Sequence, residues 1–199
     1  YNGLDSFYYT ASSGGYYATT KVIVTIVHDC CSAGNYKQIL GPIITTTQTL
    51  IAVEDSYLKL KNATTNFGAA TDIILDREST DKHVGVVKFD FTALTCYATL
   101  VRSATLKMYR ISGTDQVVSA YRLMKNWTES QVTWNNRLTG TAWTTAGGDY
   151  NGADLIDATG TPVANIYNWN ATNIIHNMVC STALYPNYGF IVRVDATGG

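Results

Sequence analysis

Short stretches in which hydrophobic and polar residues alternate run through most of the chain. They are rich in Val, Ile, Thr and Tyr, the residues that fit a pleated and half-buried surface. Turn signals such as Gly14-Gly15, Gly41-Pro42 and Asn151-Gly152 separate them. The pattern predicts strands at 16–28, 47–54, 56–61, 83–91, 100–111, 116–124 and 188–194. Strands at this spacing indicate an all-β protein, an antiparallel sandwich rather than a series of βαβ units.

One segment has the spacing of a helix instead. Within residues 170–183 the apolar side chains Ile174, Ile175 and Met178 recur at helical intervals. Asn170 or Thr172 can cap its start, and His176 lies on its polar side. We expect one short helix that closes an end of the sandwich.

Residues 112–170 differ in composition from the rest of the chain: they contain all four tryptophans and many Asn, Gly and Thr residues. We expect long loops here, and such loops on a sandwich often carry binding surfaces. The tryptophan rings are of a kind that can stack on sugar rings. The alternative for Trp127 and Trp134 is that they anchor the core.

The charge balance narrows the classes of partner. There are 14 basic and 15 acidic residues, and no basic surplus favours nucleic acid. The longest apolar runs, such as residues 22–27, are far shorter than the ~18–20 residues that a membrane-spanning helix needs. Because the chain begins with Tyr1, we expect an export signal to have been removed, or the sequence to be part of a longer polypeptide.

The four cysteines point to an oxidising compartment. Cys30, Cys31, Cys96 and Cys180 are even in number and lack metal-ligand spacing, which favours disulfides over a zinc site. Adjacent Cys30 and Cys31 rarely bond each other, because neighbouring residues do not easily reach disulfide geometry. The pairing is left open, and free buried thiols are the alternative.

Three Asn-X-Thr patterns, at Asn62, Asn126 and Asn170, are candidate N-glycosylation sites. They fit an exported protein whose surface carries glycans.

Candidate catalytic chemistry is sparse. The sequence holds no nucleophile motif, phosphate-binding loop, dinucleotide fingerprint or zinc-protease helix. The best acidic cluster is Asp149, Asp154 and Asp157, for which turn formation is the leading interpretation, a structural Ca²⁺ site the second and glycoside hydrolysis the third. We therefore expect a protein that is not an enzyme and has no cofactor, with structural calcium as the alternative and its ligands unassigned.

Residues 126–150, NWTESQVTWNNRLTGTAWTTAGGDY, carry a family resemblance. This tract resembles the signature of DNRLRE domains, which also occurs in disaggregatase-related repeats and in a related class of carbohydrate-binding modules. Further landmarks of the family resemble segments 52–75, 86–94, 101–111, 169–179 and 187–194, so that the likeness spans about 48–199. The resemblance implies a jelly-roll-like β-sandwich with an extracellular role in sugar binding, adhesion or repeat assembly.

The two ends of the chain depart from this family pattern. In the family, two more strands follow the segment that residues 187–194 resemble, whereas this sequence ends at 199. Residues 2–28 resemble those two strands, so the resemblance implies a permuted or strand-exchanged domain. We expect three parts: 1–28 as a strand region that completes the sandwich, 29–46 as a cysteine-containing linker, and 47–199 as the sandwich.

The completing strand is predicted to place Val22, Val24 and Ile26 on one apolar face. The assembly strand as a whole comprises Val22, Ile23, Val24, Thr25, Ile26 and Val27. The linker 29–46 reaches about 60 Å when extended, at ~3.3 Å per residue, so the strand can enter its own sandwich or that of a neighbouring copy.

Two functions follow. The leading hypothesis is a non-enzymatic subunit of an extracellular filament or surface fibre, a head-to-tail homopolymer built by strand complementation and locked by disulfides through Cys30 and Cys31. The alternative is a secreted carbohydrate-binding or adhesion module with a polysaccharide partner, in which Trp143 and Tyr150 are the candidates for stacking on sugar rings. Both place the protein outside the cell or on its surface, without nucleic acid and without membrane insertion.

Overall fold

The computed structural model describes residues 11–13, 16–18, 26–27, 47–94, 100–159 and 164–194. Within them lie thirteen strands, one 3₁₀ turn and one α-helix. Their bounds in chain order are β1 (Ala11–Ser13), β2 (Tyr16–Ala18), β3 (Ile26–Val27), β4 (Ala52–Lys59), η1 (Leu60–Asn62), β5 (His83–Phe89), β6 (Leu100–Val101), β7 (Thr105–Tyr109), β8 (Val118–Leu123), β9 (Asn136–Leu138), β10 (Thr141–Ala142), β11 (Tyr150–Thr159), β12 (Ile166–Asn170), α1 (Thr172–Cys180) and β13 (Phe190–Val194).

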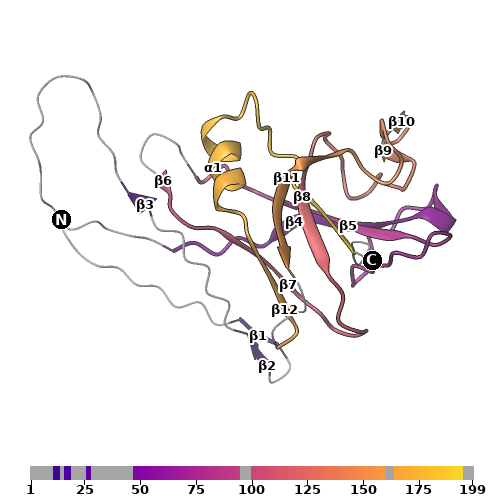
Figure 1. Cartoon of the computed structure of the whole chain (residues 1–199), viewed down its shortest axis with the longest axis horizontal. Coiled ribbons are helices and arrows are strands. Elements are labelled where there is room, and N and C mark those ends of the chain that lie inside the picture. Colours follow the sequence, from indigo (N-terminus) through magenta and orange to yellow (C-terminus); the bar gives the residue numbers. More distant parts are fainter. Residues whose placement is uncertain are drawn as a thin grey trace, which may run out of the picture.

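A five-stranded antiparallel sheet forms the centre of the fold (Figure 1). Its strand order is β11-β8-β13-β5-β4, so β13 lies in the middle although it comes last in the chain. Side chains of β13 alternate between the two faces, with Phe190, Val192 and Val194 on one and Ile191 on the other. Both faces are apolar, which requires a cover on each side.

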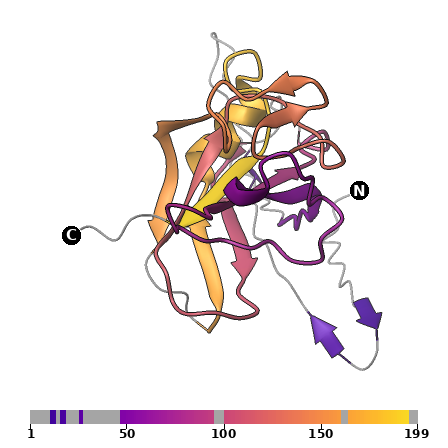
Figure 2. The same ribbon diagram turned by 90° about the vertical axis from the view of Figure 1, so that its right-hand side faces the viewer.

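The first face packs against a smaller second layer. This layer contains the antiparallel pairs β7–β12 and β3–β6, and α1 follows β12 directly. Figures 1 and 2 show α1 beyond one end of β7 and β12. Leu106 of β7, Trp169 of β12 and Met178 of α1 are buried against Phe190 and Val192, and they form the larger of two hydrophobic cores.

The second face is covered by the segment between β8 and β11. Trp127, Trp134 and Trp143 pack there against Leu58 of β4 and Ile191 of β13. The indole of Trp127 donates a hydrogen bond to the Tyr188 carbonyl oxygen at 2.8 Å, and that of Trp143 donates to the Thr133 oxygen at 3.0 Å. Each large ring therefore fills the core while its one polar atom is satisfied.

Two Asn-x-Gly sequences fasten loops to this framework by the same geometry. The Asn66 amide donates to the Glu129 and Val132 carbonyl oxygens, each at 2.7 Å, while its own oxygen accepts from the Gly68 amide. The Asn187 amide donates to the Phe89 carbonyl oxygen at 2.7 Å, and its oxygen accepts from the Gly189 amide.

Glycine is required at the third position of both sequences. A Cβ on Gly68 would clash with the Glu129 backbone, and one on Gly189 would clash with the Val87 carbonyl oxygen. Gly189 also has φ +81°, which favours glycine.

The structure confirms the predicted fold class, an antiparallel β protein with one short helix. The predicted helix 170–183 is α1, and the Asn170 oxygen accepts from the Thr172 amide at its start. The predicted strand 100–111 is wrong in its continuity, because it breaks into β6 and β7 around the buried Ala104.

The expectation of long loops in residues 112–170 is also corrected for part of that range. The ten-residue strand β11 lies there and pairs with β8, and β12 pairs with β7. The sequence YNGADLIDAT of β11 carries a glycine and two aspartates, and its pairing with β8 is interrupted by register shifts, so its strand pattern is weak.

Replacing Gly68 by Ala is expected to lower the free energy of unfolding by about 2 kcal/mol, because the added methyl group overpacks the contact with Glu129. Gly152→Ala is the matched control, since nothing lies within 4 Å of a Cβ there. Denaturant unfolding of both variants measures the difference. Equal free energies of unfolding for the two variants would contradict the prediction, because they would mean that the backbone around Glu129 moves to accommodate the methyl group at no cost in stability.

Candidate functional site

The outward face of the pair β7–β12 is a regular polar surface with one large aromatic ring. Alternation along both strands turns every second side chain inward and the others to solvent. All six outward residues are exposed. They oppose one another as Thr105–Asn170, Lys107–Asn168 and Tyr109–Ile166.

Tyr109 distinguishes this face from the rest of the surface. Among the residues whose exposure the structure describes, it is the one aromatic side chain that is more than a third exposed, at 66%. Ile166 lies opposite it, and Ile111 follows two residues later, also exposed. A flat ring beside small apolar surface is suited to the apolar face of a sugar ring.

Hydrogen-bonding groups continue from Tyr109 along the strands. The amides of Asn168 and Asn170, the Lys107 ammonium and the Thr105 hydroxyl belong to the outward positions of this ladder. From Thr105 to Tyr109 the strand extends about 14 Å at ~3.4 Å per residue, the length of a short oligosaccharide. The face is therefore both long enough and polar enough to hold a linear glycan along the strand direction.

The inner sides of the same strands hold the face rigid. Tyr167 and Trp169 stack with ring centroids 5.5 Å apart. The Trp169 indole donates to the Val118 carbonyl oxygen at 2.9 Å, and the Tyr167 hydroxyl donates to the Gln116 oxygen at 2.9 Å. At the Tyr109 end, the Arg110 guanidinium contacts the Asp115 carboxylate and donates to the Asn165 side chain.

A second aromatic cluster surrounds Tyr150, one of the residues expected to stack on sugars. Tyr150 and Tyr121 are half-buried, with ring centroids 4.8 Å apart. The Arg193 guanidinium lies 5.2 Å from the Tyr150 ring centroid and donates to its hydroxyl. These partners cover part of the Tyr150 ring, so the cluster offers less open aromatic surface than Tyr109.

The expectation for Trp143 is contradicted. Its side chain is only 4% exposed and packs in the second core, so no face of the indole can meet a sugar. Trp127, Trp134 and Trp169 are buried as well, in agreement with the alternative that Trp127 and Trp134 anchor the core.

A polar cleft lies between β4 and two loops, lined by Glu54, Asn66, Gly68, Ala69, Glu129 and Ser130. The polar side chains of Glu54 and Asn66 in this cleft already make structural contacts. The Glu54 carboxylate accepts from the Lys88 ammonium and from the Glu129 amide, and Asn66 holds the Glu129 backbone. Burial lowers the pKa of Lys88, whose ammonium also lies 5.1 Å from the Trp127 ring centroid. We assign this cleft to loop attachment.

The aspartate cluster has structural partners where the structure describes it. The Asp149 carboxylate accepts from the Thr144 and Thr145 amides at 2.8 and 2.7 Å and so orders a turn. Asp154 pairs with the Arg122 guanidinium at 2.8 Å, and Arg122 is 4% exposed. The side chain of Asp157 lies outside the described residues. Among the described residues no cluster of three or more metal-binding side chains occurs.

The three glycosylation candidates, Asn62, Asn126 and Asn170, are all exposed. The Asn126 side chain accepts from Arg137, and that of Asn170 accepts from Thr172. Glycosylation at these positions stays a prediction.

Cys180, at the end of α1, is disulfide-bonded. The other three cysteines, Cys30, Cys31 and Cys96, lie outside the described residues. The pairing of Cys180 therefore stays open.

The predicted assembly strand is described at one end only. Val22, Ile23, Val24 and Thr25 lie outside the described residues. Ile26 and Val27 form β3, which pairs antiparallel with β6.

The described residues contain no helix that is long and apolar enough to cross a bilayer.

The two packed layers of antiparallel strands define the fold class, a β-sandwich. The sequence matches carbohydrate-binding module family 96 over residues 46–185, and the chain belongs to this family. That range contains β7, β12 and all six outward residues of the ladder. A search of curated proteins finds no match.

The family supports the alternative function, a carbohydrate-binding module, and gives no support to the fibre subunit. Such modules are non-catalytic and typically act outside the cell or on its surface. The narrower resemblance to DNRLRE domains stays a prediction.

Asp154→Ala is expected to lower the free energy of unfolding by about 3 kcal/mol, because the buried Arg122 guanidinium loses its carboxylate. The control is Asp115→Ala, whose half-exposed carboxylate pairs with Arg110 and contributes less than about 1 kcal/mol. Denaturant unfolding measures both. Unchanged stability of Asp154→Ala would contradict the structural role given to the Arg122–Asp154 pair.

Proposed function

We propose that the protein is an extracellular carbohydrate-binding module and that the outward face of β7–β12 is its binding surface. The observation that carries this proposal is the 66% exposure of Tyr109 at the end of a ladder of outward polar side chains. Membership of carbohydrate-binding module family 96 supports the ligand class.

The face recognises a glycan by two kinds of contact. The Tyr109 ring packs against the C–H groups of one sugar, which removes apolar surface of both from water. Asn168, Asn170 and Thr105 exchange hydrogen bonds with the hydroxyl groups of the following sugars. Lys107 adds a positive charge at the middle of the face, where it attracts a carboxylate or sulfate of an acidic glycan.

The rigid backing of the face favours binding. The inward partners of the ladder, Leu106 and Trp169 among them, are almost fully buried. Little backbone freedom is therefore lost when a glycan docks, and the outward side chains alone have to be ordered.

Tyr109→Ala is expected to weaken polysaccharide binding at least about 10-fold, which corresponds to ~1.4 kcal/mol, because the stacking surface is removed. Affinity gels and calorimetry measure binding across neutral and acidic polysaccharides. Tyr109→Phe keeps the ring and is expected to bind within about 3-fold of the unchanged protein.

Leu184→Ala is the control for general loss of exposed apolar surface, since Leu184 is 77% exposed and lies outside the ladder. It is expected to bind normally. Loss of binding in Tyr150→Ala but not in Tyr109→Ala, with both variants folded, would move the site to the Tyr121–Tyr150–Arg193 cluster. Absence of binding across the whole panel would contradict the proposed function.

A further inference from the structure

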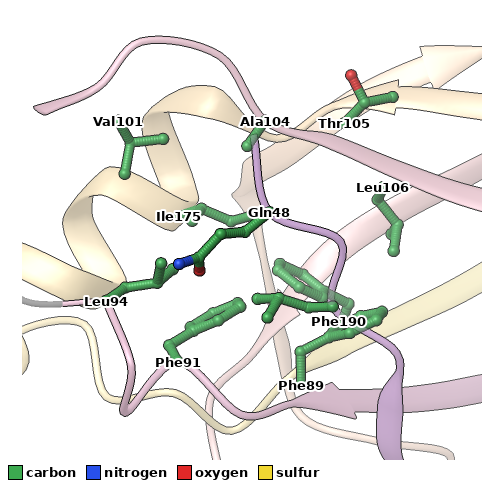
Figure 3. Close-up of a pocket in the computed structure, with 11 residues that line it drawn as sticks. Gln48, Phe89, Phe91, Leu94, Val101, Ala104, Thr105, Leu106, Ile175 and Phe190 are labelled. Carbon is green, nitrogen blue, oxygen red and sulfur yellow. The ribbon is translucent and has the colours of Figure 1, made fainter. Parts of the chain in front are cut away.

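An apolar groove opens between the two layers beside β6 and β7. Val101, Ala104 and Leu106 form one side of it, and Phe89, Phe91 and Phe190 form its floor (Figure 3). Gln48 and Leu50 also line it. The lining of the groove is apolar except for Gln48 and Thr105. Leu50, Phe89, Leu94 and Ile175 are only half-buried along it.

The groove runs beside an open strand edge. In the part of the chain that the structure describes, β7 pairs with β12 on one side and with no strand on the other. A strand edge above apolar surface is the kind of site that another extended segment completes, by a ladder of backbone hydrogen bonds and by burial of alternate side chains.

One end of such a segment is already in position. β3 pairs antiparallel with β6, with Ile26 opposite Val101 and Val27 opposite Leu100. Val101 lines the groove, and β6 leads directly into β7. Residues before Ile26, if they continue this strand, run along the open edge of β7, because antiparallel pairing matches decreasing with increasing residue number.

The break between β6 and β7 shifts the spacing of the buried residues by one position. The buried positions are Val101, Ala104 and Leu106, spaced by three and then by two. If the strand before Ile26 continues past this break, one extra residue within 102–104 would form a β-bulge, in which two residues oppose one. With this shift Val24 would lie opposite Ala104, and Val22 would lie opposite Leu106. Without it Lys21 would lie opposite Leu106 and point into the core.

We propose that residues 20–25 of the same chain extend β3 along β7 and fill the groove with Val22 and Val24. The second layer then becomes a three-stranded sheet, β12-β7-β3. Ile23 and Thr25 face outward, and Lys21 lies beside Lys107 on the outer surface. The segment that fills the groove is assigned to the same chain because β3 and β6 pair with each other within one copy. The proposal does not depend on carbohydrate binding.

Isotope-mixed cross-linking tests both the register and the source of the strand. Equal amounts of unlabelled and ¹⁵N-labelled protein are unfolded, refolded together and treated with a short amine-reactive cross-linker. We expect a Lys21–Lys107 cross-link in light–light and heavy–heavy peptide pairs only. The positive control is Lys59–Lys82, because Lys59 opposes His83, next to Lys82, across β4 and β5.

Light–heavy Lys21–Lys107 pairs would overturn the assignment to the same chain and would favour strand exchange between copies, the arrangement of the fibre hypothesis. Recovery of Lys59–Lys82 without any Lys21–Lys107 pair would overturn the docking itself.

A pair of substitutions tests which side chains enter the groove. Val24→Asp places a charge among the apolar residues and is expected to lower Tm by about 5–10 °C. Ile23→Asp puts the same charge on the neighbouring, outward position and is expected to change Tm by less than about 2 °C. A larger loss for Ile23→Asp, or equal losses for the two, would overturn the proposed register.

Discussion

Burial of both faces of the five-stranded sheet is the constraint on which the rest of the structure depends. β13 lies at its centre and alternates Phe190 and Val192 toward one layer with Ile191 toward the other. Because neither face can remain in water, the sheet requires two covers. The covers differ in kind, with strands and a helix on one side and a tryptophan-rich segment on the other.

The tryptophan-rich cover explains why the aromatic residues that stand out most in the sequence are not available to a ligand. Trp127 and Trp143 each fill the second core and donate their indole N–H to a carbonyl oxygen. The aromatic ring that reaches solvent, Tyr109, lies instead on the smaller layer. Most of the other outward residues of β7 and β12 are polar, because each strand has only one buried face, so the outward positions are free to serve recognition.

The sugar face and the apolar groove share β7 but use different parts of it. The outward side chains of Lys107 and Tyr109 belong to the proposed binding face, whereas Leu106 and the open edge belong to the groove. A strand added at that edge would extend the outer surface by one strand width without covering Tyr109. Completion of the sheet and recognition of a glycan are therefore compatible on the same small layer.

The sequence by itself determined the class of the fold. The short runs of Val, Ile and aromatic residues in β5, β8 and β13 are a local signal of strands, and the helical spacing of apolar residues in α1 is a local signal too. The tract 126–136 indicated the kind of module, because the Trp, Thr and Asn positions of that tract are tied to specific contacts in the second core. Strand β11 could not be predicted from such local signals, because its pairing with β8, and not its composition, holds it in the sheet.

Only the tertiary structure decided which residues reach solvent. Composition alone does not distinguish Trp143 from Tyr109 as a ring that could reach solvent. Within its own strand segment, the sequence pattern also leaves open whether Tyr109 or a neighbour such as Met108 faces inward. Register with β12 and the break at Ala104 settle that choice. A strand's periodicity fixes which side chains share a face, but the partner that covers one face is supplied by residues far away in the chain.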